Sequence, residues 1–147
     1  TKVDVLGQIP KVDALKNINL YKKLYKCIQK NLIVSSISLH HGGLANAFFR
    51  SAMGGMLGAE MNLQDIPGTA DSETALLFSE SQGRILVSIN PQNKKVFEEM
   101  MKGVSFKNIG KVLSTNELLV KSKSGKKLFK NSVEVIEQSY KRRFKAY

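Results

Sequence analysis

The feature that most constrains the fold of this chain is its alternation of short β-branched runs with segments of helical spacing. "NLIVSSIS" (31–38) and "GRILVSIN" (83–90) are typical of strands, because branched side chains pack well on a pleated surface. The second run places Ile85, Val87 and Ile89 on one face, as expected for a period of two residues. At least two segments therefore contribute to a sheet.

The segments between these runs have the residues that begin and end helices. "LANAFFRSAM" (44–53) is followed by Gly54-Gly55, where we expect that helix to end. "PQNKKVFEEMMKG" (91–103) begins with proline, which is favoured in the first helical turn, and closes on glycine.

The first helix is predicted to begin near Asp13, whose side chain is a good N-cap, after a leading segment (1–10) closed by Pro10. Its apolar residues recur at helical spacing, with lysines on the other face. These residues are Leu15, Ile18 and Ile28, with either Tyr21 or the pair Leu24 and Tyr25 between them.

The remaining elements complete an α+β pattern. We expect a strand over 57–63, a loop over 64–71, a short helix over 72–79 capped by Asp71 or Ser72, antiparallel strands over 106–113 and 117–123, a short strand over 127–129, and a final helix from Ser132. The last strands would form a β-meander. Helices interleaved with strands, followed by late antiparallel strands, predict an α+β fold with a mixed sheet covered by helices.

A length of 147 residues suits one domain, residues 1–147, and because the chain lacks an initiator Met we expect an excerpt of a longer polypeptide. No apolar run approaches the roughly 20 residues of a membrane helix, so no membrane partner is expected. Cys27 is the only cysteine, which rules out an intrachain disulfide and favours a cytoplasmic location.

The formal net charge of +11 raises the possibility of nucleic-acid binding, but its distribution argues against it. Residues 1–30 hold seven Lys and two Asp, and residues 121–147 hold nine Lys or Arg and two Glu. The middle, 31–120, holds seven basic and eight acidic residues, and aromatic residues do not alternate with the basic ones. Most of these lysines are expected to be ordinary solvated side chains.

Candidate chemistry begins at the loop that follows the first strand. His40 and His41 are adjacent, so their side chains diverge, and no Cys or carboxylate stands at zinc-ligand spacing; no metal site is predicted. They either contact backbone or a bound phosphate, or only fill a turn. Gly42 and Gly43, at a helix start, either let N–H groups approach an anion or serve a turn that needs positive φ.

A second candidate is "FSESQGR" (78–84), where charged residues precede an apolar strand. Arg84 could hold a carboxylate or phosphate with two N–H groups, or Glu80 could pair with it inside the protein. No catalytic triad is available, because His40 and His41 are the only histidines.

Three stretches together resemble the C-terminal domain of the aminoimidazole ribonucleotide synthetase superfamily, most closely its phosphoribosylformylglycinamidine synthase branch. They are "SLHHGGLANAFFRSAMGGMLGAEMNL", "LLFSESQGRILVSI" and "KNIGKVL", in that order. Where the family has Ser-Asp before Gly-Gly, this chain has His40 and His41, so the loop lacks the carboxylate oxygen that magnesium prefers.

The resemblance implies a part of a purine-biosynthesis ligase that uses ATP, magnesium and glutamine-derived ammonia. Its expected partners are N-terminal ATP-binding domains and a glutaminase domain or subunit. The implied nucleotide- or substrate-binding residues are His40, His41, Gly42, Gly43, Glu80, Ser81 and Arg84, with no catalytic residue among them. Two alternatives stay open: a domain that serves only assembly, and another ATP-using superfamily member.

Overall fold

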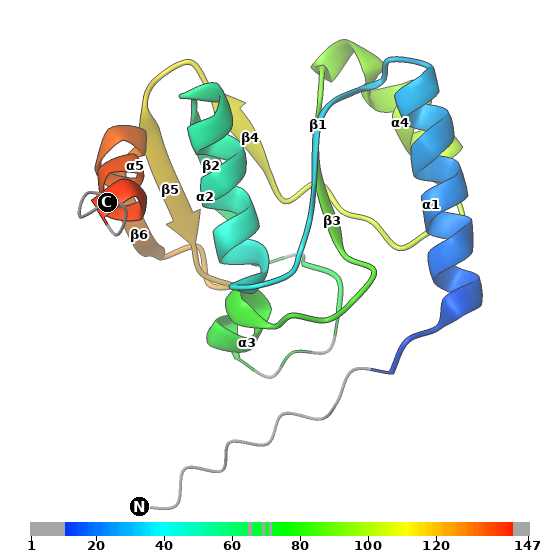
Figure 1. Cartoon of the computed structure of the whole chain (residues 1–147), viewed down its shortest axis with the longest axis horizontal. Coiled ribbons are helices and arrows are strands. Elements are labelled where there is room, and N and C mark those ends of the chain that lie inside the picture. Colours follow the sequence, from blue (N-terminus) through cyan, green and yellow to red (C-terminus); the bar gives the residue numbers. More distant parts are fainter. Residues whose placement is uncertain (1–10, 65, 69, 71, 143–147) are drawn as a thin grey trace, which may run out of the picture.

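The computed structural model describes residues 11–64, 66–68, 70 and 72–142 (Figure 1). Its elements are α1 (Ala14–Gln29), β1 (Ile33–Ser38), α2 (Gly43–Gly55), β2 (Gly58–Asn62), α3 (Glu73–Phe78), β3 (Ile85–Ile89), the 3₁₀ turn η1 (Pro91–Asn93), α4 (Lys94–Met100), β4 (Gly110–Leu113), β5 (Glu117–Lys121), β6 (Lys127–Ser132) and α5 (Val133–Lys141). This order confirms the α+β prediction. Within these ranges, no helix combines the length and hydrophobicity needed to cross a bilayer.

Three helices begin at side chains that satisfy their first free N–H groups. Asp13, Ser72 and Ser132 each accept a hydrogen bond from the backbone N–H three residues further on, at 3.1, 3.1 and 3.4 Å. The predicted caps at Asp13 and Ser72 are therefore confirmed. The alternative cap Asp71, the leading segment 1–10 and the chain beyond Arg142 lie outside the described residues.

The strands form two sheets. β1 and β3 make a two-stranded antiparallel ribbon, and the other four strands make a mixed sheet in the order β4-β2-β5-β6. β2 pairs antiparallel with β4 and parallel with β5, which confirms the mixed sheet. The predicted β-meander is wrong, because β2 lies between β4 and β5; only β5 and β6 are consecutive neighbours.

Some predicted boundaries also differ. α2 includes Gly54 and Gly55, two residues more than expected, and ends before Met56, whose backbone is left-handed (φ 49°). The segment from Pro91 starts as a 3₁₀ turn, so the α-helix proper begins at Lys94. β4 starts at Gly110, four residues later than expected.

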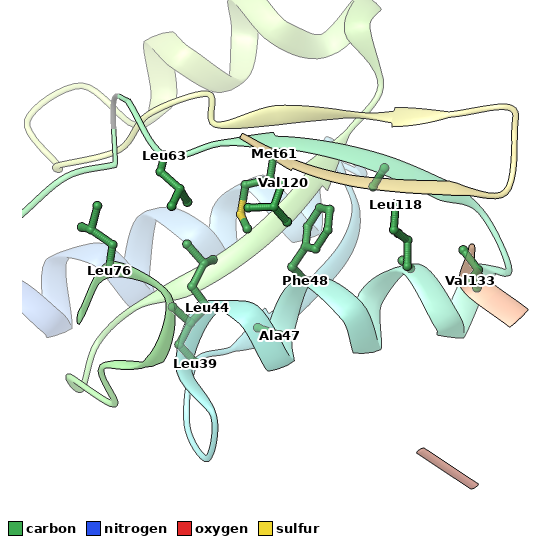
Figure 2. Close-up of a cluster of buried hydrophobic side chains, with 12 residues drawn as sticks. Leu39, Leu44, Ala47, Phe48, Met61, Leu63, Leu76, Leu118, Val120 and Val133 are labelled. Carbon is green, nitrogen blue, oxygen red and sulfur yellow. The ribbon is translucent and has the colours of Figure 1, made fainter. Parts of the chain in front are cut away.

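The larger core fills the space between α2 and the four-stranded sheet (Figure 2). α2 contributes Leu44, Ala47, Phe48 and Ala52, the sheet contributes Ala59, Met61, Leu118 and Val120, and Leu39, Leu63, Leu76 and Val133 close the ends. Leu63, Leu118 and Val133 are fully buried. Burial of this apolar area is the main favourable term that holds the two layers together.

A smaller core joins α1 and α4 to the β1–β3 ribbon. It is formed by Cys27, Leu32, Phe97 and Met101, with Val87 packed against it. The ribbon therefore lies between two cores, and this arrangement explains why every residue of β3 is half-buried. Burial raises the pKa of the Cys27 thiol, which keeps that group protonated inside the smaller core.

The apolar residues that the sequence grouped on one face of α1 do not share one environment. Leu24 is buried, but Leu15, Ile18, Tyr21, Tyr25 and Ile28 are exposed. Cys27, on the same side as Leu24, takes their expected place in the core. The two sets lie on different sides because the buried side faces α4 and the ribbon, as Figure 1 shows.

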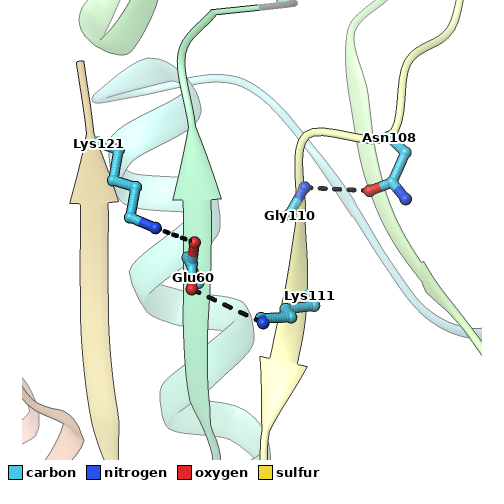
Figure 3. Close-up of polar contacts among 5 residues, drawn as sticks. All are labelled: Glu60, Asn108, Gly110, Lys111 and Lys121. Atoms are coloured by element: carbon cyan, nitrogen blue, oxygen red, sulfur yellow. Dashed lines mark hydrogen bonds and ion pairs between the residues drawn. The ribbon is translucent and has the colours of Figure 1, made fainter. Parts of the chain in front are cut away.

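The outer face of the four-stranded sheet carries a row of charges (Figure 3). Glu60 of β2 lies between Lys121 of β5, at 2.5 Å, and Lys111 of β4, at 3.9 Å. The hydrogen bond from Lys121 lowers the pKa of Glu60 below its ordinary 4.5. The ionised carboxylate is thus part of the native structure.

This ion pair predicts a pH dependence of stability. Because the pKa of Glu60 is lowered in the folded state, its contribution is present above about pH 4.5 and is lost as the pH falls through the folded pKa. We expect Glu60→Gln to flatten the fall in unfolding free energy between about pH 5 and 3. Urea titrations across this range measure the slope. Lys121→Met should flatten it similarly; a Glu60→Gln profile parallel to that of the unsubstituted protein would contradict the prediction.

Candidate functional site

The predicted site residues meet at one end of the β1–β3 ribbon. In the antiparallel register Ser38 lies opposite Ile85, so the loop that follows β1 must lie beside the loop that precedes β3. The Leu39 N–H donates to the Arg84 carbonyl at 2.9 Å and extends the pairing by one step. Residues 40–43 and 79–84, separated by more than thirty residues in sequence, are therefore neighbours.

The two glycines shape the first of these loops. Gly42 and Gly43 have φ of +79° and +57°, in the left-handed region that favours glycine. The Gly43 N–H donates to the His40 carbonyl at 2.7 Å. A Cβ at Gly43 would lie 2.7 Å from the carbonyl oxygens of Leu77 and Ser79. Both positive φ and close approach thus require glycine, as the turn interpretation predicted.

The N–H of Gly42, the residue that precedes α2, is met by a carboxylate of the chain itself. Glu80 accepts a hydrogen bond from the Gly42 N–H at 2.8 Å. Its second oxygen lies 3.8 Å from Nδ1 of His41, whose side chain is 95% exposed. An anion at this position is favoured by the helix dipole, so the loop has the electrostatics expected of an anion site, with Glu80 as the anion.

Arg84 does not pair with Glu80, so of the two alternatives for Arg84 the internal ion pair is absent from the structure. Its guanidinium donates to the Ser79 carbonyl at 3.2 Å, to the Ser79 hydroxyl at 2.9 Å and to the Leu76 carbonyl at 3.5 Å. These acceptors lie at the C-terminal end of α3, where carbonyls lack helical partners. Burial lowers the pKa of Arg84, and no carboxylate forms an ion pair with it in the described part of the chain.

The other predicted residues lie in the same two loops, 40–43 and 79–84, which together form the corner at this end of the ribbon. His40 and His41 are both exposed, and their rings meet edge to face with centroids 5.8 Å apart. Ser81 is half-buried in the second loop. Among the residues that the structure describes, no three His, Cys, Asp or Glu side chains are grouped in a way that could hold a metal ion. The groups available to a ligand here are backbone N–H, imidazole and hydroxyl.

Sequence reasoning missed two asparagines that support this corner. Asn46 donates from Nδ2 to the His41 carbonyl at 2.7 Å, one helical turn after Gly42. Asn17 of α1 lies so close to Gly83 that a Cβ there would approach its side-chain oxygen to within 3 Å. Asn46 had a local signal, its position at the start of α2, whereas the contact of Asn17 depends on the packing of α1.

Comparison with known proteins decides the family. A sequence profile described as "AIR synthase related protein, C-terminal domain" matches residues 2–122. The chain belongs to this family. AIR synthase is the aminoimidazole ribonucleotide synthetase of the resemblance, which is thereby confirmed. The matched region of this AIR synthase-related domain includes both loops of the candidate site.

Solved structures share the fold of this AIR synthase-related domain. Phosphoribosylformylglycinamidine synthase II from Thermotoga maritima matches with a TM-score of 0.76 and 23% identity, over 87% of this chain and 22% of that one. T. maritima PurL complexed with ATP matches with 0.73 and 21%, over 80% and 21%. A HypE–HypF complex matches with 0.67 and 15%, over 89% and 45%. The domain thus spans about a fifth of the length of the first two chains.

Proposed function

We propose that this AIR synthase-related domain is the C-terminal domain of a phosphoribosylformylglycinamidine synthase, an ATP-dependent C–N ligase. The complete enzyme would convert formylglycinamide ribonucleotide to its amidine with ammonia from glutamine. The observation that carries the proposal is the meeting of loops 40–43 and 79–84 at one ribbon end. Such an end, where a helix N-terminus meets a carboxylate that a ligand anion could replace, suits one wall of a nucleotide or substrate cleft.

Within this proposal each loop has its own role. Gly42 and Gly43 offer backbone N–H groups to an anionic part of the ligand only once Glu80 releases the Gly42 N–H and the His40 carbonyl releases the Gly43 N–H. His40, His41 and Ser81 add polar contacts from exposed or half-exposed positions. Arg84 positions the second loop, because its guanidinium donates to the carbonyls of Ser79 and Leu76. Any contact of Arg84 with the ligand would be peripheral.

ATP and magnesium belong to the whole enzyme in this proposal. Magnesium prefers anionic oxygen, and the loop offers imidazoles at His40 and His41 instead. We therefore assign the metal to the N-terminal ATP-binding domains of the same enzyme. A glutaminase domain or subunit would supply the ammonia, and the complete enzyme would act in the cytoplasm.

A second candidate is a domain that serves only assembly. It is favoured by the hydrogen bond from Gly42 to Glu80, because the strongest anion position is already filled by the chain itself. Membership of another ATP-using branch is a third candidate, favoured by the structural likeness to HypE.

Reconstitution separates these candidates. The 147-residue chain is added to a phosphoribosylformylglycinamidine synthase from which this domain has been removed, and amidine formation dependent on ATP and glutamine is measured. We expect activity to return, and His40→Ala combined with His41→Ala to raise the KM for the ribonucleotide about tenfold, or ~1.4 kcal/mol. Gln92→Ala, at an exposed site on η1, is the control.

The possible results of the reconstitution distinguish the candidate functions. Restored activity that both sets of variants retain equally indicates an assembly domain. No restoration, with correct folding shown by circular dichroism, contradicts the assignment to this enzyme.

A further inference from the structure

The exposed side of α1 carries an apolar stripe that nothing in the described structure covers. Ile18, Tyr21, Tyr25 and Ile28 are 47%, 47%, 61% and 45% exposed. The helix lies at one edge of the molecule beside α4 (Figure 1), and none of the four residues belongs to the smaller core. Leu15, at the N-terminal end of the stripe, is 81% exposed. Large apolar side chains in contiguous exposed positions mark interaction surfaces more often than isolated ones do.

The spacing of the stripe indicates the shape of what would cover it. Ala14, Ile18, Tyr21, Tyr25 and Ile28 follow one another at intervals of four, three, four and three residues. This spacing is typical of helices that pack along one another with knobs-into-holes contacts, in which each side chain fits between side chains of the other helix. From Ala14 to Ile28 the stripe is about 21 Å long at ~1.5 Å per residue. A helix of about four turns would match it.

The charge beside the stripe indicates the composition of that helix. Lys22 and Lys26 flank the stripe on its solvent side, and both are exposed. No ion pair joins either lysine to a carboxylate in the described part of the chain, and α1 itself contains no acidic residue. Charges at such flanking positions select partners of opposite sign.

A second copy of this chain fits poorly. It would bring another α1 with the same lysines to the seam, and each chain carries a net charge of +11. Like charges that face each other across a helix pair are destabilising. Basic flanks instead complement glutamate or aspartate on the incoming helix.

We propose that the exposed stripe of α1 is a docking surface for an amphipathic helix of a partner protein, with apolar residues at the same four-three spacing and acidic residues beside them. This surface is distinct from the corner formed by loops 40–43 and 79–84. The inference does not rest on nucleotide binding at that corner.

A designed peptide tests this inference. The probe is a synthetic helix of about two heptads with leucine at the seam and glutamate at the flanking positions, and the comparison peptide has lysine in place of glutamate. Binding to the full 147-residue chain is measured by fluorescence anisotropy at two salt concentrations. We expect the acidic peptide to bind, the basic peptide to bind at least tenfold more weakly, and added salt to weaken the acidic complex.

Variants of the chain locate the binding. Ile18→Ser with Tyr25→Ser should weaken the acidic peptide at least tenfold, whereas Val34→Ser, which changes a 74% exposed residue on β1, should have no effect. Lys22→Glu with Lys26→Glu should reverse the preference between the two peptides and, as surface changes, should keep the fold.

Three outcomes would overturn the inference. They are equal binding of both peptides, acidic-peptide binding unaffected by the serine changes in folded protein, and self-association that those changes abolish in analytical ultracentrifugation. The last would identify a second copy as the occupant.

Discussion

Replacing Gly43 with alanine is expected to lower the free energy of unfolding by roughly 2–4 kcal/mol and to separate the two loops of the candidate site. Two costs combine. The φ of +57° is unfavourable for any residue with a Cβ, and that Cβ would lie 2.7 Å from the carbonyl oxygens of Leu77 and Ser79. Since these are backbone atoms, the loop or α3 must shift. Urea denaturation measures the first effect.

The separation of the loops has its own readout. If the loop 40–43 moves away from α3, the Gly42 N–H loses the carboxylate of Glu80 and exchanges faster with solvent. Amide hydrogen exchange at Gly42 is therefore expected to speed up in Gly43→Ala beyond any change at α1.

Gly103 provides a matched control. Its φ is +79°, also left-handed, but a Cβ there would have no neighbour within 4 Å. Gly103→Ala should therefore show only the conformational cost, about 1–2 kcal/mol. Equal losses in the two variants would mean that the contact with α3 contributes nothing, and the close approach of the loops would be refuted.

The second large effect is expected at the centre of the sheet. Leu118 is fully buried on β5, between β2 and β6, and faces the core beneath α2. Leu118→Ala removes buried methyl groups and leaves a cavity that the surrounding strands can close only in part. We expect a loss of about 2–5 kcal/mol in unfolding free energy, measured by urea or thermal unfolding.

The same substitution at Leu128 is the control for Leu118. Leu128 lies on the edge strand β6 and is 46% exposed, so its replacement by alanine removes much less buried surface. A loss below about 1 kcal/mol is expected. If the two variants lost similar stability, the core would not be centred on β5 as described.

Local signals account for the parts of the fold that were predicted correctly. Asp13 and Ser72 cap helices through contacts with N–H groups three residues away, and such contacts need no tertiary partner. The ordered motifs around Gly42-Gly43 and 78–84 were likewise sufficient for the family, which the match over residues 2–122 confirmed. Element order and the mixed sheet follow from patterns of this kind.

The errors share a physical cause: each concerned which partner a group takes. β5 pairs with β2 instead of β4, although β4 is nearer in sequence, because strand pairing depends on which edges the packed layers bring together. Arg84 donates to carbonyls of α3, whereas Glu80 accepts from the Gly42 N–H. The spacing of residues in the sequence predicts neither the strand next to β5 nor the acceptors of Arg84.

The kinds of element, their order, the helix caps and the family can be predicted from the amino-acid sequence, since these depend on residues within a few positions of one another or on the order of motifs. Which side of α1 is buried depends on tertiary packing. Two apolar faces satisfy the same helical periodicity, and α4 with the ribbon covers the one that carries Leu24 and Cys27. The meeting of loops 40–43 and 79–84 likewise depends on the tertiary structure, because antiparallel pairing of β1 with β3 joins chain ends that are remote in sequence.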